Sequence, residues 1–144
     1  MGVADLHVTL AFLGWRPLEQ ADELWRVAAK AVAGMQLPRF EPIAIVPVPR
    51  RRPRLLALDL GDPTGAGDDW HGAVSGGLSQ AGLLEPEARP FWPHVTVARG
   101  RKGARVRAPG AGPELAPFAP TALTLYRSLL SPAGARYMPL RSSG

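Results

Sequence analysis

The chain has 144 residues, of which 46% are apolar, and its 17 basic and 12 acidic side chains give a net charge of +5. This size and apolar content suit one folded domain, and no apolar run approaches the ~18 residues needed to span a membrane. The absence of cysteine excludes disulfides and fits a cytoplasmic protein. We therefore expect a single cytoplasmic domain over residues 1–144 with no membrane partner, and a monomer is favoured over an oligomer.

The first predicted elements are a strand over residues 6–12 and a helix over residues 18–32. The strand is a β-branched, apolar run that closes at Gly14. The helix has apolar residues at helical spacing, and its acids come early and its bases late, as the helix dipole prefers.

The middle of the chain predicts two strands and a second helix. Residues 40–48 and 55–60 flank the RRRPR turn and indicate a hairpin, and two prolines within the first strand indicate a sheet edge or a break. A loop rich in Gly and Asp then leads to a helix over residues 70–81, for which Asp68 or Asp69 is the expected cap.

The rest of the chain predicts three further strands. Residues 93–99 form one strand, and residues 100–117, rich in Gly, Pro, Ala and Arg, indicate a mobile loop. Residues 122–127 and 137–140 form a closing hairpin. The order strand, helix, two strands, helix and three strands indicates an α+β domain with mainly antiparallel sheet.

Two of the predicted strands contain the same pattern, His-Val-Thr. The first copy contains His7 and Thr9, and the second contains His94 and Thr96. Because side chains alternate across a strand, the histidine and the threonine of each copy share one face. Two such strands facing each other would place two imidazoles and two hydroxyls around one cleft.

The residue types in this pattern suit the opening of a phosphodiester. Two histidines supply an acid and a base, and each proton transfer is typically worth about 10²–10⁴ in rate. The threonine hydroxyls, with Arg99 three residues after Thr96, are candidates to bind the phosphoryl oxygens as charge builds. One isolated histidine on a strand is more often a structural residue, but a matched pair in one five-residue context favours catalysis.

The other conspicuous residues receive structural interpretations. His71 has neither strand context nor a threonine two residues later, so a solvated helix position is favoured. Trp92 is more simply explained by core packing than by contact with a base, and Tyr126 and Tyr137 fit ordinary strand positions equally well. No metal-ligand spacing such as HExxH or CxxC occurs, so we expect chemistry without a metal or a cofactor.

Basic residues are concentrated in two segments that contain no acid. Together these segments hold nine of the 17 basic residues. Localised positive charge beside a phosphate site attracts a polyanion, and solvated turns are the alternative explanation. The first cluster consists of Arg50, Arg51, Arg52 and Arg54, and the second of Arg99, Arg101, Lys102, Arg105 and Arg107.

The sequence resembles the 2H phosphoesterases, and within them the bacterial and archaeal RNA 2′,3′-cyclic phosphodiesterases, also called 2′-5′ RNA ligases. The segments that carry the resemblance are LHVTLAFLG, PRRRPRLLAL, RPFWPHVTVAR and LYRSLLSPAGARY, and they occur in the family's order over nearly the whole chain. The resemblance implies two similar lobes of mainly antiparallel sheet, with helices outside and a cleft between the lobes. It also implies that His7 and His94 are the catalytic pair and that Thr9, Thr96 and Arg99 bind phosphate.

The resemblance further implies the reaction. It predicts hydrolysis of RNA 2′,3′-cyclic phosphate ends, or of cyclic nucleotides, to 2′-phosphates, with His94 assigned as the base and His7 as the acid. The same groups serve the reverse joining of a cyclic phosphate end to a 5′-hydroxyl, and a non-catalytic nucleotide or RNA binder is the third alternative. Family members begin with a strand and a helix ahead of the first motif, so we expect this chain to be N-terminally truncated, with an exposed sheet edge.

Overall fold

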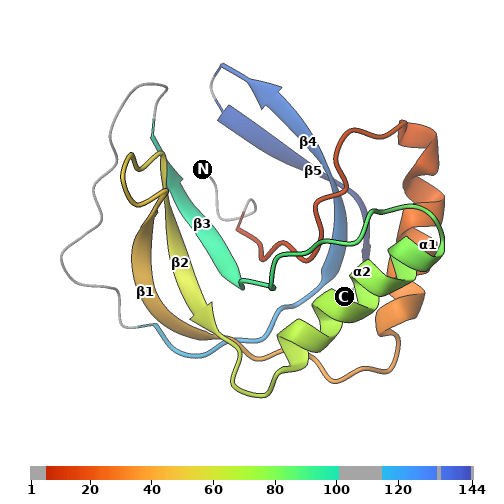
Figure 1. The fold of residues 1–144 in the computed structure, drawn as a ribbon, viewed down its shortest axis with the longest axis horizontal. Coiled ribbons are helices and arrows are strands. Elements are labelled where there is room, and N and C mark those ends of the chain that lie inside the picture. Colours follow the sequence, from red (N-terminus) through yellow and green to blue (C-terminus); the bar gives the residue numbers. More distant parts are fainter. Residues whose placement is uncertain (1–5, 101–114, 133, 144) are drawn as a thin grey trace.

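The structure is a computed structural model that describes residues 6–100, 115–132 and 134–143. Its elements in chain order are η2 (Leu18–Gln20), α1 (Ala21–Val32), β1 (Glu41–Val48), β2 (Leu55–Gly61), α2 (Ala66–Gln80), β3 (His94–Arg99), β4 (Leu123–Ser131) and β5 (Gly134–Ser143). The strands form two antiparallel sheets, β1-β2-β3 and β4-β5, and the two α-helices lie together beside the β4–β5 hairpin (Figure 1). The predicted α+β class is confirmed. None of the described helices is long and apolar enough to cross a membrane.

The three-stranded sheet follows the sequence prediction closely. β1 and β2 pair from Glu41 opposite Gly61 to Val48 opposite Leu55, and β1 lies at the edge, as its two prolines indicate. β3 pairs with the other side of β2, which makes β2 the central strand. One face of this sheet packs into an apolar cluster, the sheet core, which consists of Phe40, Leu58, Leu60 and Val95 with the partly buried Val8, Ile45, Val97 and Phe118.

The two α-helices form a second cluster, the helix core. The helix predicted over residues 18–32 is confirmed as η2 followed by α1, and α1 packs against α2, β4 and β5. Burial of each large apolar side chain here contributes about 1.5–3 kcal/mol. The buried members are Leu24, Val32, Val74, Leu78 and Leu83, and Leu123 and Leu125 of β4 pack against them.

Helix α2 begins four residues earlier than predicted, and its N-cap is Gly65 rather than Asp68 or Asp69. The carboxylate of Asp62 accepts hydrogen bonds from the backbone N–H groups of Gly67 (3.0 Å) and Asp68 (2.8 Å). Asp68 therefore lies inside the first turn, where its charge suits the helix dipole. A Cβ atom at Gly67 would lie 2.7 Å from a ring carbon of Phe40, so glycine permits the start of α2 to reach the sheet core.

The strand predicted over residues 6–12 is wrong in extent. Only Val8 pairs with the sheet, through an isolated antiparallel bridge to Val95 of β3. Val8 packs against the sheet core, whereas Leu10 and Leu13 pack against the helix core. The segment crosses from one core to the other between β3 and the β4–β5 hairpin (Figure 1), and this crossing ends its pairing with β3.

The closing hairpin is longer than predicted, because backbone pairing continues through residues that are exposed. β4 and β5 pair from Leu123 opposite Ser143 to Ser131 opposite Gly134. Of the predicted loop over residues 100–117, positions 101–114 lie outside the described residues.

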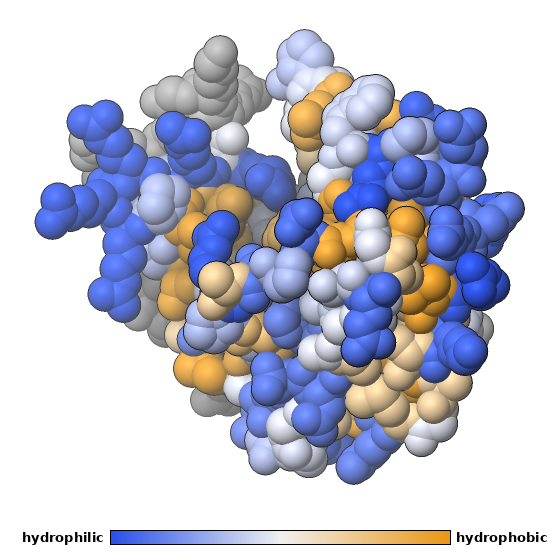
Figure 2. Space-filling view, turned by 45° about the vertical axis from the view of Figure 1, so that its right-hand side comes forward, coloured by the Kyte–Doolittle hydropathy of each residue, from blue (hydrophilic) through white to orange (hydrophobic). Residues whose placement is uncertain are grey.

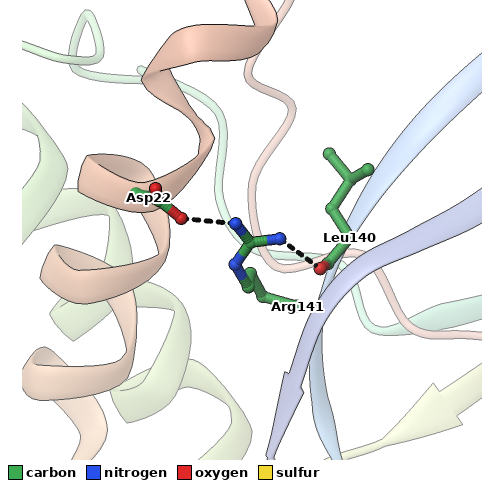
Figure 3. A network of polar contacts seen from close by, with 3 residues as sticks. All are labelled: Asp22, Leu140 and Arg141. Carbon is green, nitrogen blue, oxygen red and sulfur yellow. Dashed lines mark hydrogen bonds and ion pairs between the residues drawn. The ribbon is translucent and has the colours of Figure 1, made fainter.

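One polar contact joins the hairpin to α1. The guanidinium of Arg141 on β5 forms an ion pair with Asp22 of α1 and donates a second hydrogen bond, of 2.7 Å, to the carbonyl of Leu140 (Figure 3). The side chains of Arg141 and Asp22 are 45% and 82% exposed, so this pair adds little stability.

Candidate active site

The bridge between Val8 and Val95 fixes the relative direction and register of the two His-Val-Thr motifs. Because this bridge is antiparallel, the two copies run in opposite directions, with His7 opposite Thr96 and Thr9 opposite His94. Both valines pack into the sheet core. Side chains alternate along an extended chain, so both histidines and both threonines are expected on the opposite face, called the motif face below.

His7 on the motif face lies against the second sheet. Its ring centroid is 4.5 Å from that of Tyr137 on β5 and 5.4 Å from that of Tyr126 on β4. The two tyrosine rings are 6.0 Å apart. His7 is therefore the point at which the motif face meets the hairpin, and it is half-buried there.

His94 begins β3 and is held by the residue two positions before it. Its ring stacks on Trp92 with a centroid distance of 3.9 Å and an interplanar angle of 18°. Its Nδ1 atom lies 2.9 Å from the backbone carbonyl oxygen of Trp92. A carbonyl oxygen can only accept a hydrogen bond, so this contact requires the hydrogen on Nδ1 and leaves Nε2 for proton transfer.

The indole of Trp92 is itself held by an acidic side chain. Its Nε1–H donates a 2.8 Å hydrogen bond to Oδ1 of Asp59 on β2. Asp59 pairs with His94 in the β2–β3 register. Trp92 is 40% exposed, so the core position favoured from the sequence is wrong.

The remaining predicted site residues follow along β3. Thr96 is half-buried and pairs with Ala57 of β2. Arg99 is exposed at the end of the strand, about 16 Å from His94 at the usual rise per residue. Its neighbour Gly100 donates a 2.7 Å backbone hydrogen bond to the carbonyl of Arg54. The structure therefore places Arg99 beside the first basic cluster and away from His94.

That cluster forms the turn between β1 and β2. All of its arginine side chains are exposed, and the turn lies at the Arg99 end of β3 (Figure 1). Figure 2 shows the surface hollowed at its upper edge between the β1–β3 sheet and the hairpin, with hydrophilic side chains crowded on the side of this turn. Basic side chains thus border one end of the space between the two sheets.

The described features outside the motif face do not form a second candidate active site. His71 in α2 is half-buried and stacks on Phe91 at 4.9 Å, so the solvated position expected for it is incorrect. A shallow hollow of about 380 Å³ near Phe12 and Glu85 includes neither motif. Among the residues that the structure describes, no three histidine, aspartate or glutamate side chains gather as a metal site requires. Metal-independent chemistry stays a prediction.

The partners of the two histidines were not identified from the sequence. Tyr126 and Tyr137 lie in the hairpin segment that supports the family resemblance, and this was the available signal. Asp59 lies on the predicted strand over residues 55–60, but nothing in the sequence pairs that strand with the second motif. No signal in the sequence indicates that Trp92 folds back over His94.

Comparisons with known proteins find similarity in structure. No protein-family model matches the chain, and no curated protein matches it in sequence. Protein TT0787 of Thermus thermophilus has a TM-score of 0.75 and 26% identity, over 95% of this chain and 76% of that chain. A structure described as a phosphoesterase has a TM-score of 0.69 and 25% identity, over 96% and 76%. LigT of E. coli, solved with NADP+, has a TM-score of 0.69 and 25% identity, over 96% and 75%. The chain therefore has a fold similar to that of LigT-type phosphoesterases.

Proposed function

We propose that this chain is a metal-independent phosphodiesterase that hydrolyses the 2′,3′-cyclic phosphate at RNA ends, or in cyclic nucleotides, to a 2′-phosphate. The observation that carries the proposal is the antiparallel Val8–Val95 bridge, which sets the two His-Val-Thr motifs side by side in opposite directions. The similarity to LigT and to a structure described as a phosphoesterase supports a phosphoesterase or RNA-ligase type of function.

In the proposed reaction, Nε2 of His94 accepts a proton from water as the water oxygen attacks phosphorus. The bond from phosphorus to the 3′-oxygen breaks, and His7 donates a proton to that oxygen. The product is a 3′-hydroxyl beside a 2′-phosphate, and the two histidines exchange their protonation states. Each proton transfer is worth about 10²–10⁴ in rate.

The two threonines are proposed to donate hydrogen bonds to the phosphoryl oxygens. The antiparallel bridge between Val8 and Val95 puts Thr9 beside His94 in register and Thr96 beside His7, which supports this role. Hydroxyl donors fixed before the reaction stabilise the charge that builds on those oxygens. Arg99, farther along β3, is proposed to bind phosphate at the end of the motif face.

The first experiment identifies the product. The purified chain is incubated in EDTA with a 2′,3′-cyclic nucleotide and with a short RNA that ends in a cyclic phosphate, and products are resolved by phosphorus NMR. We expect a 2′-phosphate from the wild type and at least about a 10²-fold loss of kcat in His7→Ala and in His94→Ala.

Other outcomes point to other functions. A joined RNA product would identify ligation, and salt-dependent RNA binding without turnover would identify a binder. A 3′-phosphate product, or full activity in both histidine variants, would contradict the proposed mechanism.

We further propose that the Arg50–Arg54 turn binds phosphates farther along an RNA chain than the reacting one. The turn lies at the opposite end of β3 from His94, so a cyclic mononucleotide at the motif face leaves it unoccupied. For single-stranded nucleic acid, the logarithm of the binding constant falls by about 0.7 for each phosphate neutralised when the salt concentration rises tenfold.

The test compares two double variants of equal charge. Arg50→Gln/Arg51→Gln should lower kcat/KM for the RNA end, reduce its salt dependence and leave the cyclic mononucleotide unaffected. Arg26→Gln/Lys30→Gln removes the same charge from exposed positions on α1 and serves as the control. Equal losses in the two double variants, or a loss with the mononucleotide as well, would overturn this role of the turn.

A further inference from the structure

We infer that Trp92, fixed by Asp59, is a positioning residue that holds the imidazole of His94 in one orientation and one tautomer. This inference rests on the proposed function of His94 as the base. Neither Trp92 nor Asp59 belongs to the repeated motif, and neither is proposed to touch the reacting atoms.

Trp92 holds His94 at two places. Its indole lies nearly parallel to the imidazole at 3.9 Å, so rotation of the imidazole out of this plane would lose the stacking contact. Its backbone carbonyl accepts the hydrogen on Nδ1 at 2.9 Å. Rotation of the ring by half a turn would exchange Nδ1 for carbon and lose this hydrogen bond. The two contacts together select a single ring orientation.

Asp59 fixes the indole to the sheet. Trp92 precedes β3 and lies outside any strand, so its side chain needs an external anchor to stay in place. The 2.8 Å hydrogen bond from Nε1–H to Oδ1 of Asp59 supplies that anchor. Asp59 is half-buried on the central strand, opposite His94. The β2–β3 register therefore sets the position of the indole over the imidazole.

This arrangement suits a base. With its hydrogen on Nδ1, the neutral ring presents its lone pair at Nε2, which is the atom proposed to accept the proton from water. When Nε2 accepts this proton, the positive charge forms against the face of an indole, the aromatic ring that best stabilises a cation. The tyrosine contacts described for His7 are instead tilted or edge-on.

Three variants separate the parts of the arrangement. Trp92→Ala removes the stacking ring, Trp92→Phe keeps an aromatic face but loses the N–H group, and Asp59→Asn keeps an oxygen that can accept from the indole. Phe91→Ala is the matched control, because it removes a stacking ring from His71 one position away. Each variant is measured for kcat and KM on a cyclic nucleotide, and for its imidazole signals by ¹⁵N and ¹H NMR.

We expect Trp92→Ala to lower kcat about tenfold or more with KM changed by less than about twofold, because a misplaced base loses rate rather than ground-state binding. The ring protons of His94 should lose their upfield ring-current shift, and its ¹⁵N signals should report a mixture of tautomers. Asp59→Asn should retain most of the rate and one tautomer, whereas Trp92→Phe, which loses the hydrogen bond to Asp59, should fall between the wild type and Trp92→Ala in both readouts. Phe91→Ala should match the wild type.

The outcomes distinguish this inference from the proposed function. Wild-type kcat and one His94 tautomer in Trp92→Ala would overturn the positioning role, even if His94→Ala is inactive. A raised KM with unchanged kcat would also overturn it, since that result assigns Trp92 to substrate binding. If the wild type shows no turnover but the NMR signature changes as expected, the proposed function fails and the structural role of Trp92 stands.

Discussion

The two copies of the His-Val-Thr motif share a sequence but not their surroundings. The second copy lies within β3, paired to the central strand β2, and its histidine is stacked on Trp92. The first copy meets the sheet only at Val8, and its histidine lies against Tyr126 and Tyr137 of the other sheet. A local pattern therefore decides which face a side chain takes, whereas partners distant in sequence decide how firmly it is held.

The largest effect that distinguishes the two copies is expected from substitution of their threonines. Valine removes the hydroxyl and keeps the β-branched shape, so both substitutions should preserve the fold. We expect Thr96→Val to lower kcat about 10²-fold, because its donor is held in a continuous strand, and Thr9→Val to lower it about tenfold. Steady-state kinetics on a cyclic nucleotide measure both values. Equal losses would mean that the two copies are supported alike.

The next largest effect concerns the contact between Gly67 at the start of α2 and Phe40 of the sheet core. Gly67→Ala should lower the free energy of unfolding by about 1–3 kcal/mol, because the added Cβ overpacks against Phe40. Gly72→Ala, in the same helix with no atom within 4 Å of the added Cβ, should raise stability by up to about 1 kcal/mol. Urea denaturation measures both. A Gly67→Ala variant as stable as Gly72→Ala would show that α2 does not press on the sheet core.

The smallest effect concerns the support of the first copy. Arg141→Ala removes the ion pair that joins β5, which carries Tyr137, to α1. Since both partners are accessible to solvent, we expect a loss of only about 0.2–1 kcal/mol in unfolding free energy, reduced further at high salt. Thermal denaturation at two salt concentrations measures it. A larger loss that salt does not change would assign the stability to packing of the arginine stem.

The sequence predicted those features that depend on local periodicity. The alternation around each motif predicted the shared face, and the two prolines of β1 indicated the edge that this strand occupies. The fold class followed from the order of the elements. The sheet edge and the fold class are confirmed, because each depends on the conformation of a few adjacent residues.

The features that the sequence did not predict depend on contacts between distant segments. The extent of the first strand was wrong because residues after Val8 turn toward the helix core. The start of α2 was misplaced because the carboxylate that binds its first N–H groups, Asp62, lies in the preceding loop. The position of Trp92 over His94 depends on Asp59, 33 residues earlier in the chain. No local pattern contains such a pairing.

The most direct test is a double-mutant cycle on the two histidines, with turnover of a 2′,3′-cyclic nucleotide measured in EDTA for the wild type, His7→Ala, His94→Ala and the double variant. If the two act as acid and base in one site, each single variant loses at least about 10² in kcat, and the double variant is scarcely slower than the single variants. Losses that multiply in the double variant, or one histidine whose removal leaves kcat unchanged, would contradict a shared site.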